Sequence, residues 1–235
     1  MSLTQHGAHL FRSTRFGFFN SYLLRDEGGL TLIDTNVPGS APAILKAVAQ
    51  LGLPVKRIVL THAHGDHVGS LDALRAALPG AEVSISARDA RILAGDHSLD
   101  AGESQRKLKG DLKVTQTRPD RLLQDGDRVG SLRAVATPGH TPGHFAFLDE
   151  RDGTLIAGDA FQTAAGTAVA GQMRLLFPFP ALATWDAQTA MQSAARLAEL
   201  KAQRLAVGHG AVLEAPVQAM RAAVAQAQRH VTPLT

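Results

Sequence analysis

The sequence contains no cysteine among its 235 residues. A disulfide framework, a thiolate metal site and a thiol nucleophile are therefore all excluded. Any metal ion that the protein binds must be held by nitrogen and oxygen atoms, which histidine and acidic side chains supply.

Long apolar runs and long runs of like charge are also missing. No run of eighteen apolar residues occurs, and the first residues lack the basic and apolar regions of a secretory signal, so we expect a cytoplasmic protein. The formal net charge is only +3, from 24 Lys and Arg against 21 Asp and Glu, and no block of five like charges appears. We therefore expect neither a membrane nor a nucleic acid as a partner.

The remaining composition is that of a globular protein, and strand-like segments alternate with helical ones. We expect a single domain over residues 1–235 with an α/β layered architecture. The predicted strands are 18–24, 30–34, 57–61, 82–86, 132–136, 145–148, 154–157 and 204–207, the first two forming a hairpin. The predicted helices are 42–51, 71–78, 184–201 and 216–228, with Thr184 or Asp186 as the cap of the third. Residues 95–128 are polar and irregular and indicate a lid-like insertion.

The strongest signal is the segment Thr61-His62-Ala63-His64-Gly65-Asp66-His67, which directly follows a predicted strand. Imidazole nitrogens suit zinc, and a carboxylate adds charge and a hard oxygen ligand. A loop leaving a strand with this spacing can serve two metal ions a few ångströms apart. The competing interpretation is a surface turn decorated with polar histidines, but later residues weigh against it.

Three further ligand candidates follow later strands, each with glycine beside it. They are His140 in Thr137-Pro138-Gly139-His140, Asp159 in Gly158-Asp159, and His209 in Gly208-His209-Gly210. Loops at strand ends are where α/β sheets place their functional sites, and glycine lets the backbone approach closely. Each residue alone has an ordinary structural explanation, but their joint occurrence favours a metal site.

Taken together, the motifs THAHGDHVG, TPGHTPGH, AGDAF and VGHG resemble the metallo-β-lactamase superfamily, in the order in which that superfamily uses them. The resemblance covers nearly the whole chain. It implies a four-layer αβ/βα sandwich, in which two mixed β-sheets face each other with helices outside and the site lies along one edge.

The resemblance also implies a complete set of seven metal ligands. His62, His64 and His140 would bind a first metal, Asp66, His67 and His209 a second, and Asp159 both. Asp34, in the segment LIDTN, would orient a ligand histidine by hydrogen bonding, although a simple turn residue is an equal alternative. His144 is expected to pack beside the site rather than to bind metal.

These features predict an enzyme, a metal-dependent hydrolase acting on a small-molecule substrate. Two divalent ions, with zinc expected and iron or manganese as alternatives, would generate a bridging hydroxide that attacks an ester, lactone, thioester or amide carbonyl. Asp66 is the expected catalytic residue, because it can accept a hydrogen bond from the nucleophile. A homodimer is compatible with the sequence.

Several particular members of the superfamily are a poor match. Glyoxalase II enzymes carry a C-terminal helical region that grips glutathione, whereas only 26 residues follow His209 here. The best-known acyl-homoserine lactonases carry a tyrosine where this chain has Gln162. The apolar segment 161–182 could line a pocket, or equally form core or a dimer contact. An iron-dependent oxidoreductase resembling persulfide dioxygenases and a phosphodiesterase or nuclease remain the alternative functions.

Overall fold

Two β-sheets form the centre of the computed structural model, which describes residues 2–231. The first sheet has seven strands in sequence order, antiparallel through the first four and parallel thereafter. Its strands are β1 (Ser2–His6), β2 (Leu10–Arg15), β3 (Phe19–Asp26), β4 (Gly29–Ile33), β5 (Val55–Val59), β6 (Glu82–Ser86) and β7 (Arg121–Leu123).

The second sheet has six strands in the order β15-β14-β11-β10-β9-β8, with β11 and β14 parallel. Its strands are β8 (Arg128–Val129), β9 (Leu132–Ala136), β10 (Phe145–Asp149), β11 (Thr154–Ile156), β14 (Arg204–Ala206) and β15 (Leu213–Glu214). A short separate hairpin joins β12 (Phe161–Gln162) to β13 (Ala168–Val169).

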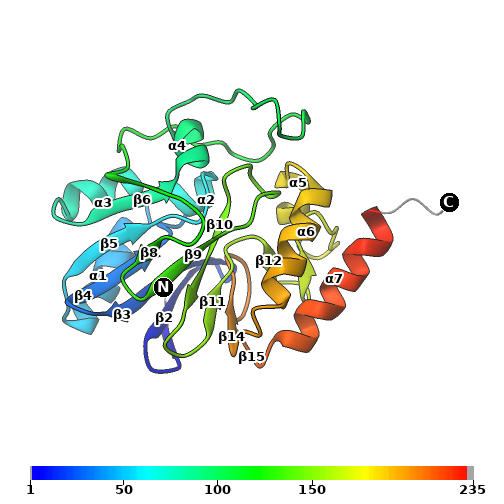
Figure 1. The fold of residues 1–235 in the computed structure, drawn as a ribbon. Coiled ribbons are helices and arrows are strands. Elements are labelled where there is room, and N and C mark those ends of the chain that lie inside the picture. The colour runs from blue at the N-terminus through cyan, green and yellow to red at the C-terminus, as the bar shows by residue number, and fades with distance from the viewer. Residues whose placement is uncertain (1, 232–235) are drawn as a thin grey trace.

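Helices cover the outer face of each sheet, on opposite sides of the molecule in Figure 1. Beside the first sheet lie α1 (Ala41–Leu51), α2 (Gly65–Val68), α3 (Leu71–Ala77) and α4 (Ala87–Leu93). Beside the second lie α5 (Phe179–Ala183), α6 (Ala187–Ala198) and α7 (Val217–Val231). The long connection after α4 crosses the top of the molecule in this view.

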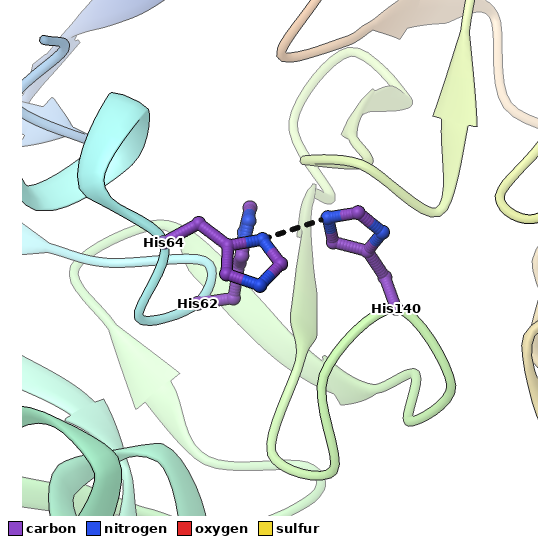
Figure 2. A group of neighbouring side chains, drawn as sticks. All are labelled: His62, His64 and His140. Atoms are coloured by element: carbon purple, nitrogen blue, oxygen red, sulfur yellow. Dashed lines mark hydrogen bonds between the residues drawn. The ribbon is translucent and has the colours of Figure 1, made fainter. Parts of the chain in front are cut away.

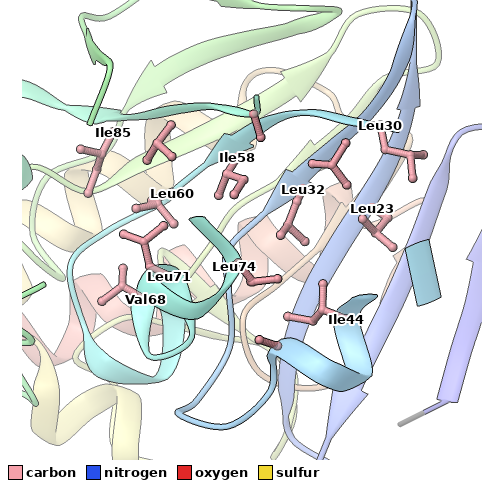
Figure 3. Packing of buried hydrophobic residues seen from close by; sticks show 14 of the residues in the cluster. Leu23, Leu30, Leu32, Ile44, Ile58, Leu60, Val68, Leu71, Leu74 and Ile85 are labelled. Carbon is pink, nitrogen blue, oxygen red and sulfur yellow. The ribbon is translucent and has the colours of Figure 1, made fainter. Parts of the chain in front are cut away.

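The two sheets and the helices outside them form four layers, and three apolar clusters lie between these layers. Side chains alternate along a strand, so Leu23 of β3 packs toward the helices with Ile44 of α1, as Figure 3 shows. Its neighbours Tyr22 and Leu24 instead face the second sheet and pack in one cluster with Phe147. A third cluster lies between the second sheet and helices α6 and α7. The architecture is therefore the four-layer α/β sandwich that the sequence predicts.

The structure corrects several predicted boundaries. The strand expected at 57–61 is β5, which ends at Val59 and leaves Thr61 and the histidine segment in the loop. The helix expected from residue 184 begins at Ala187, because Asp186 caps it by accepting a hydrogen bond from the Thr189 backbone. Segment 95–128, which the sequence indicates to be irregular, contains strand β7 and the first residue of β8. The other elements without a predicted counterpart are β1, β2, β12, β13, β15, α2, α4 and α5. Among the described helices, none has the length and apolar character needed to cross a lipid bilayer.

Candidate metal centre

The seven predicted ligands come together where loops leave both sheets. His62, His64, Asp66 and His67 lie in the loop after β5 and in α2, and His140 lies between β9 and β10. Asp159 follows β11, and His209 follows β14. Three overlapping groups have ligand atoms within 4.8 Å of one another: His62, His64 and His140; His62, His67 and Asp159; and Asp66, His67 and His209.

In the first group, one ring nitrogen of His64 and one of His140 point toward each other, and neither carries a proton. His64 Nδ1 lies 3.0 Å from His140 Nε2, the contact drawn in Figure 2. His64 Nε2 must carry its proton, because it lies 2.9 Å from the Lys109 carbonyl oxygen, which can only accept. His140 Nδ1 donates to the Thr184 hydroxyl, which itself donates to the Pro180 carbonyl. Both facing nitrogens therefore carry lone pairs.

His62 is fixed in the same way by a chain of hydrogen bonds. The Thr61 hydroxyl donates to Asp34 Oδ2 at 2.8 Å, so the ring proton of His62 lies on Nδ1, which donates to that hydroxyl at 2.9 Å. His62 Nε2 is left as a buried acceptor without a hydrogen-bond partner in the described chain. It lies in the same group as the nitrogens of His64 and His140.

Asp34 also orients His67, from the opposite side. His67 Nδ1 donates to Asp34 Oδ2 at 2.8 Å, so Nε2 points toward Asp159 Oδ1, 3.3 Å away. Neither of these two atoms has a hydrogen-bond partner within residues 2–231. A lone pair and a carboxylate oxygen face each other there, and only a proton or a metal cation can join them.

The remaining ligand atoms are carboxylate oxygens around His209. His209 Nε2 lies 3.0 Å from Asp159 Oδ2 and 3.2 Å from Asp66 Oδ2. Asp159 is buried, whereas the Asp66 side chain is 28% exposed. Asp66 is thus more exposed than Asp159, and both line the cavity together with His64, His140 and His209.

Electrostatics in the site favour positive charge. Burial opposes ionisation of Asp159, but His209 and His67 hold the pKa of its carboxyl well below the usual range. Burial lowers the pKa of His62 and His140, which stay neutral, as metal ligands must. Burial would also lower the pKa of His67, yet Asp159, Asp66 and Asp34 raise it well above its usual value. The carboxylates around His67 therefore favour positive charge at this position, as a bound metal cation would supply.

His144 lies beside the group, but both of its ring nitrogens are engaged by the protein. Nε2 accepts from the Asp159 backbone at 3.0 Å, and Nδ1 donates to the Thr137 hydroxyl at 2.7 Å. This ring positions the backbone of Asp159, which agrees with the expectation that it packs rather than binds metal.

Sequence reasoning missed the groups that support the ligands. The Lys109 carbonyl and the Thr184 hydroxyl fix the tautomers of His64 and His140. Asp89, at the start of α4, accepts hydrogen bonds from Ala63 and from residues 141 and 143. No motif marks the Lys109 carbonyl or Thr184, whereas the pattern Ser86-x-x-Asp89 after a strand is a helix-start signal that could have drawn attention to Asp89.

A cavity of about 430 Å³ opens onto this cluster. Five of the candidate ligands line it together with Gly65, Gly110 and Asp111, namely His64, Asp66, His140, Asp159 and His209. The apolar lining comes from α5, from the start of β3 and from the loop after β4. The apolar lining residues are Phe19, Val37, Pro38, Phe179, Pro180, Leu182 and Ala183.

The fold is an α/β sandwich, because two sheets face each other with helices outside. It carries a candidate metal site, the cluster of histidines and carboxylates at the strand ends. A family model described as "Metallo-beta-lactamase superfamily" matches residues 14–209, and the chain belongs to that superfamily.

Relatives agree with this assignment. "Uncharacterized protein YobT" of Bacillus subtilis is 53% identical over 211 residues, covering 89% of this chain and 91% of its own. "Probable metallo-hydrolase YflN" of the same organism is 30% identical over 197 residues, covering 76% and 74%. The structure titled "Crystal structure of TTHA1623 in a di-iron-bound form" has 28% identity and a TM-score of 0.64, covering 88% of this chain and 95% of its own.

Proposed function

We propose that this protein is a hydrolase that holds two divalent cations and cleaves a carboxylic ester, lactone, thioester or amide. The proposed ligands are His62, His64 and His140 for one cation, Asp66, His67 and His209 for the other, and Asp159 for both. When bound, two such cations supply Lewis acidity and lower the pKa of a water molecule.

One observation supports this proposal above all others. Hydrogen bonds to a backbone carbonyl and to threonine hydroxyls leave unprotonated nitrogens on His62, His64 and His140 that converge on one point. Burying several lone pairs together is unfavourable unless a cation joins them, because buried acceptors without partners cost free energy. The fixed tautomers therefore fit a metal ion better than a purely structural cluster.

The side chains of this chain would divide the remaining work. Asp66 is ionised, since His67 and His209 hold its pKa far below normal against the effect of burial. Its partly exposed carboxylate can accept a hydrogen bond from an attacking water and orient it. The apolar wall from α5 would exclude bulk water from the reacting group.

The cavity favours a carbonyl substrate over a phosphodiester. Among the described residues that line it, none is lysine or arginine, the side chains that usually grip phosphate. Asp111, which is outside the proposed ligand set, instead adds a carboxylate to the lining. For the cation we propose zinc, which suits nitrogen and oxygen ligands, with iron as the tested alternative because one related structure is in a di-iron form.

Metal analysis of the purified protein, coupled to hydrolysis assays, tests the proposal. We expect two equivalents of metal per chain, metal-dependent turnover of at least one ester, lactone, thioester or amide, and recovery of activity when a chelated sample is reloaded. A single iron per chain with oxygen uptake would instead indicate the oxidoreductase. Faster turnover of bis(p-nitrophenyl) phosphate than of carboxylic esters would indicate a phosphodiesterase.

Substitution of the ligands gives the sharper test. His64→Ala and Asp159→Ala are each expected to abolish turnover and to lower the metal content, while circular dichroism shows the fold retained. His97→Ala provides a matched control, because His97 is exposed and lies outside the cluster. Full activity in either ligand variant would refute the assignment.

A further inference from the structure

Large apolar side chains are exposed beside the mouth of the cavity. Leu175 and Leu176 form a turn and are 91% and 92% exposed, and Phe179 and Leu182 of α5 are 62% and 59% exposed. We call these four residues, together with Phe18, the apolar rim. Exposed apolar residues that gather in one region commonly mark a binding surface.

The apolar rim connects directly to the candidate metal centre through aromatic contacts. The ring of buried Phe177 lies 5.3 Å from that of His209. On its other sides Phe177 contacts Phe179, with ring centroids 5.4 Å apart, and Phe18, at 5.2 Å. Packed aromatic rings thus connect a proposed metal ligand, through buried Phe177, to the exposed side chains of Phe18 and Phe179.

Two members of the apolar rim also belong to the cavity itself. Phe179 and Leu182 line it together with Pro180 and Ala183, and His64 and His140 belong to the same lining. A ligand whose reacting group lies at the histidines would therefore lay an adjoining chain against α5. Asp111, which is not a proposed ligand, lines the same opening, and its carboxylate disfavours an anionic group beside it.

We propose that the apolar rim binds an uncharged aliphatic or aromatic acyl chain of the substrate. This inference rests on the proposed hydrolase function and narrows it to esters, lactones or thioesters with a long apolar acyl group. The chain would run from the cation site across Phe179 and Leu182 toward the Leu175–Leu176 turn. Burying the chain and these side chains together removes apolar surface of both from water, which favours binding.

A chain-length series measures this preference. The metal-loaded protein is expected to hydrolyse p-nitrophenyl octanoate with a kcat/KM at least about ten times that for p-nitrophenyl acetate. In Phe179→Ser/Leu182→Ser that ratio should fall by at least about tenfold. Leu122→Ser is the matched control, because Leu122 is similarly exposed, at 53%, but lies on β7 outside the cavity lining.

A binding measurement separates this inference from the proposed function. The uncharged fluorescent probe N-phenyl-1-naphthylamine should bind the wild type saturably and be displaced by 1-decanol, with or without metal. The Phe179→Ser/Leu182→Ser variant should lose this binding, and Leu122→Ser should keep it. If no ester is hydrolysed, the hydrolase proposal fails, and the probe still decides whether the rim binds an apolar chain.

Three results would overturn the inference. The first is a chain-length ratio that the double variant does not change, and the second is equal probe binding by all variants. The third is a dimer in sedimentation velocity that the double variant dissociates, which would make the rim an interface between two copies. If the double variant does not fold, Leu175→Ser/Leu176→Ser carries the same test, since both side chains are almost fully exposed.

Discussion

Asp34 is the residue on which the orientation of two histidines depends. Its carboxylate accepts from the Thr61 backbone and hydroxyl, both at 2.8 Å, and from His67 Nδ1. It therefore fixes His67 directly and His62 through Thr61. Its φ of 59° is the left-handed conformation that aspartate and asparagine tolerate better than most residues. Asp34 follows β4 and precedes the turn at residues 38 and 39, so the turn interpretation does not hold, and its hydrogen bond to His67 is the contact that the resemblance implies.

Asp34→Asn is predicted to weaken metal binding without unfolding the protein. Asparagine keeps the shape and tolerates the positive φ, but its amide group cannot accept hydrogen bonds at both positions. Loss of such a supporting hydrogen bond lowers metal affinity by about 10–100-fold. A competition titration with a chromophoric chelator measures this affinity.

A matched variant shows whether the loss belongs to the site. Asp72→Asn also removes a carboxylate that accepts from the backbone, at Gln116 and Thr117, and it should keep wild-type metal affinity. An unchanged affinity in Asp34→Asn would mean that its carboxylate does not control the ligand histidines.

The candidate ligands could be picked out from the sequence because each stands in a short motif after a strand, and the structure brings them together. Hydrogen-bond partners that fix the tautomers could not be read in this way. The Lys109 carbonyl belongs to the backbone, which every residue has, and Thr184 lies 44 residues from the ring it contacts. Only the folded chain shows that they meet His64 and His140.

Among the elements, α4 connects the two sides of the site. Asp89 in its first turn is fully buried and accepts from the Ala63 backbone and the Thr141 hydroxyl through Oδ2, and from the Gly143 backbone through Oδ1. Ala63 lies in the loop after β5, and the other two lie in the loop between β9 and β10. One carboxylate thus holds the loops that carry His62, His64 and His140.

Asp89→Ala is predicted to lower the free energy of unfolding by roughly 3 kcal/mol or more, because it leaves three buried donors without an acceptor. Urea denaturation followed by circular dichroism measures the change. Asp96→Ala, on an exposed residue that pairs with Arg91, should change stability little. Equal stability of the two variants would show that Asp89 does not hold the loops together.

Elements with regular hydrophobic patterns were predictable, and those without them were not. Strands β6 and β9 match their predicted ranges, since apolar residues alternate or run continuously through them. Helix α4 has seven residues with charged side chains among them, too few to show a 3.6-residue period. Strands β1 and β2 are rich in Thr, Ser, Arg and Gln, so their sequence resembles a polar terminal segment.

For the whole molecule, the site lies where the two sheets meet. The loop after β5 belongs to the first sheet, whereas His140, Asp159 and His209 follow strands of the second. A bound cation would therefore connect the two sheets directly. The superfamily resemblance predicted this layered arrangement correctly, but the polarity pattern alone indicated only an α/β protein.

Metal removal is accordingly predicted to destabilise the entire fold. A ligand that binds only the folded state raises the free energy of unfolding by about 2.7 kcal/mol when its free concentration is 100 times Kd. Chelator-treated protein should therefore melt at a lower temperature than protein with added zinc, in scanning calorimetry at neutral pH. In His64→Ala the zinc-induced shift should shrink, while in His97→Ala it should equal that of the wild type. A melting temperature that zinc leaves unchanged in the wild type would mean that the converging lone pairs of His62, His64 and His140 do not hold a cation.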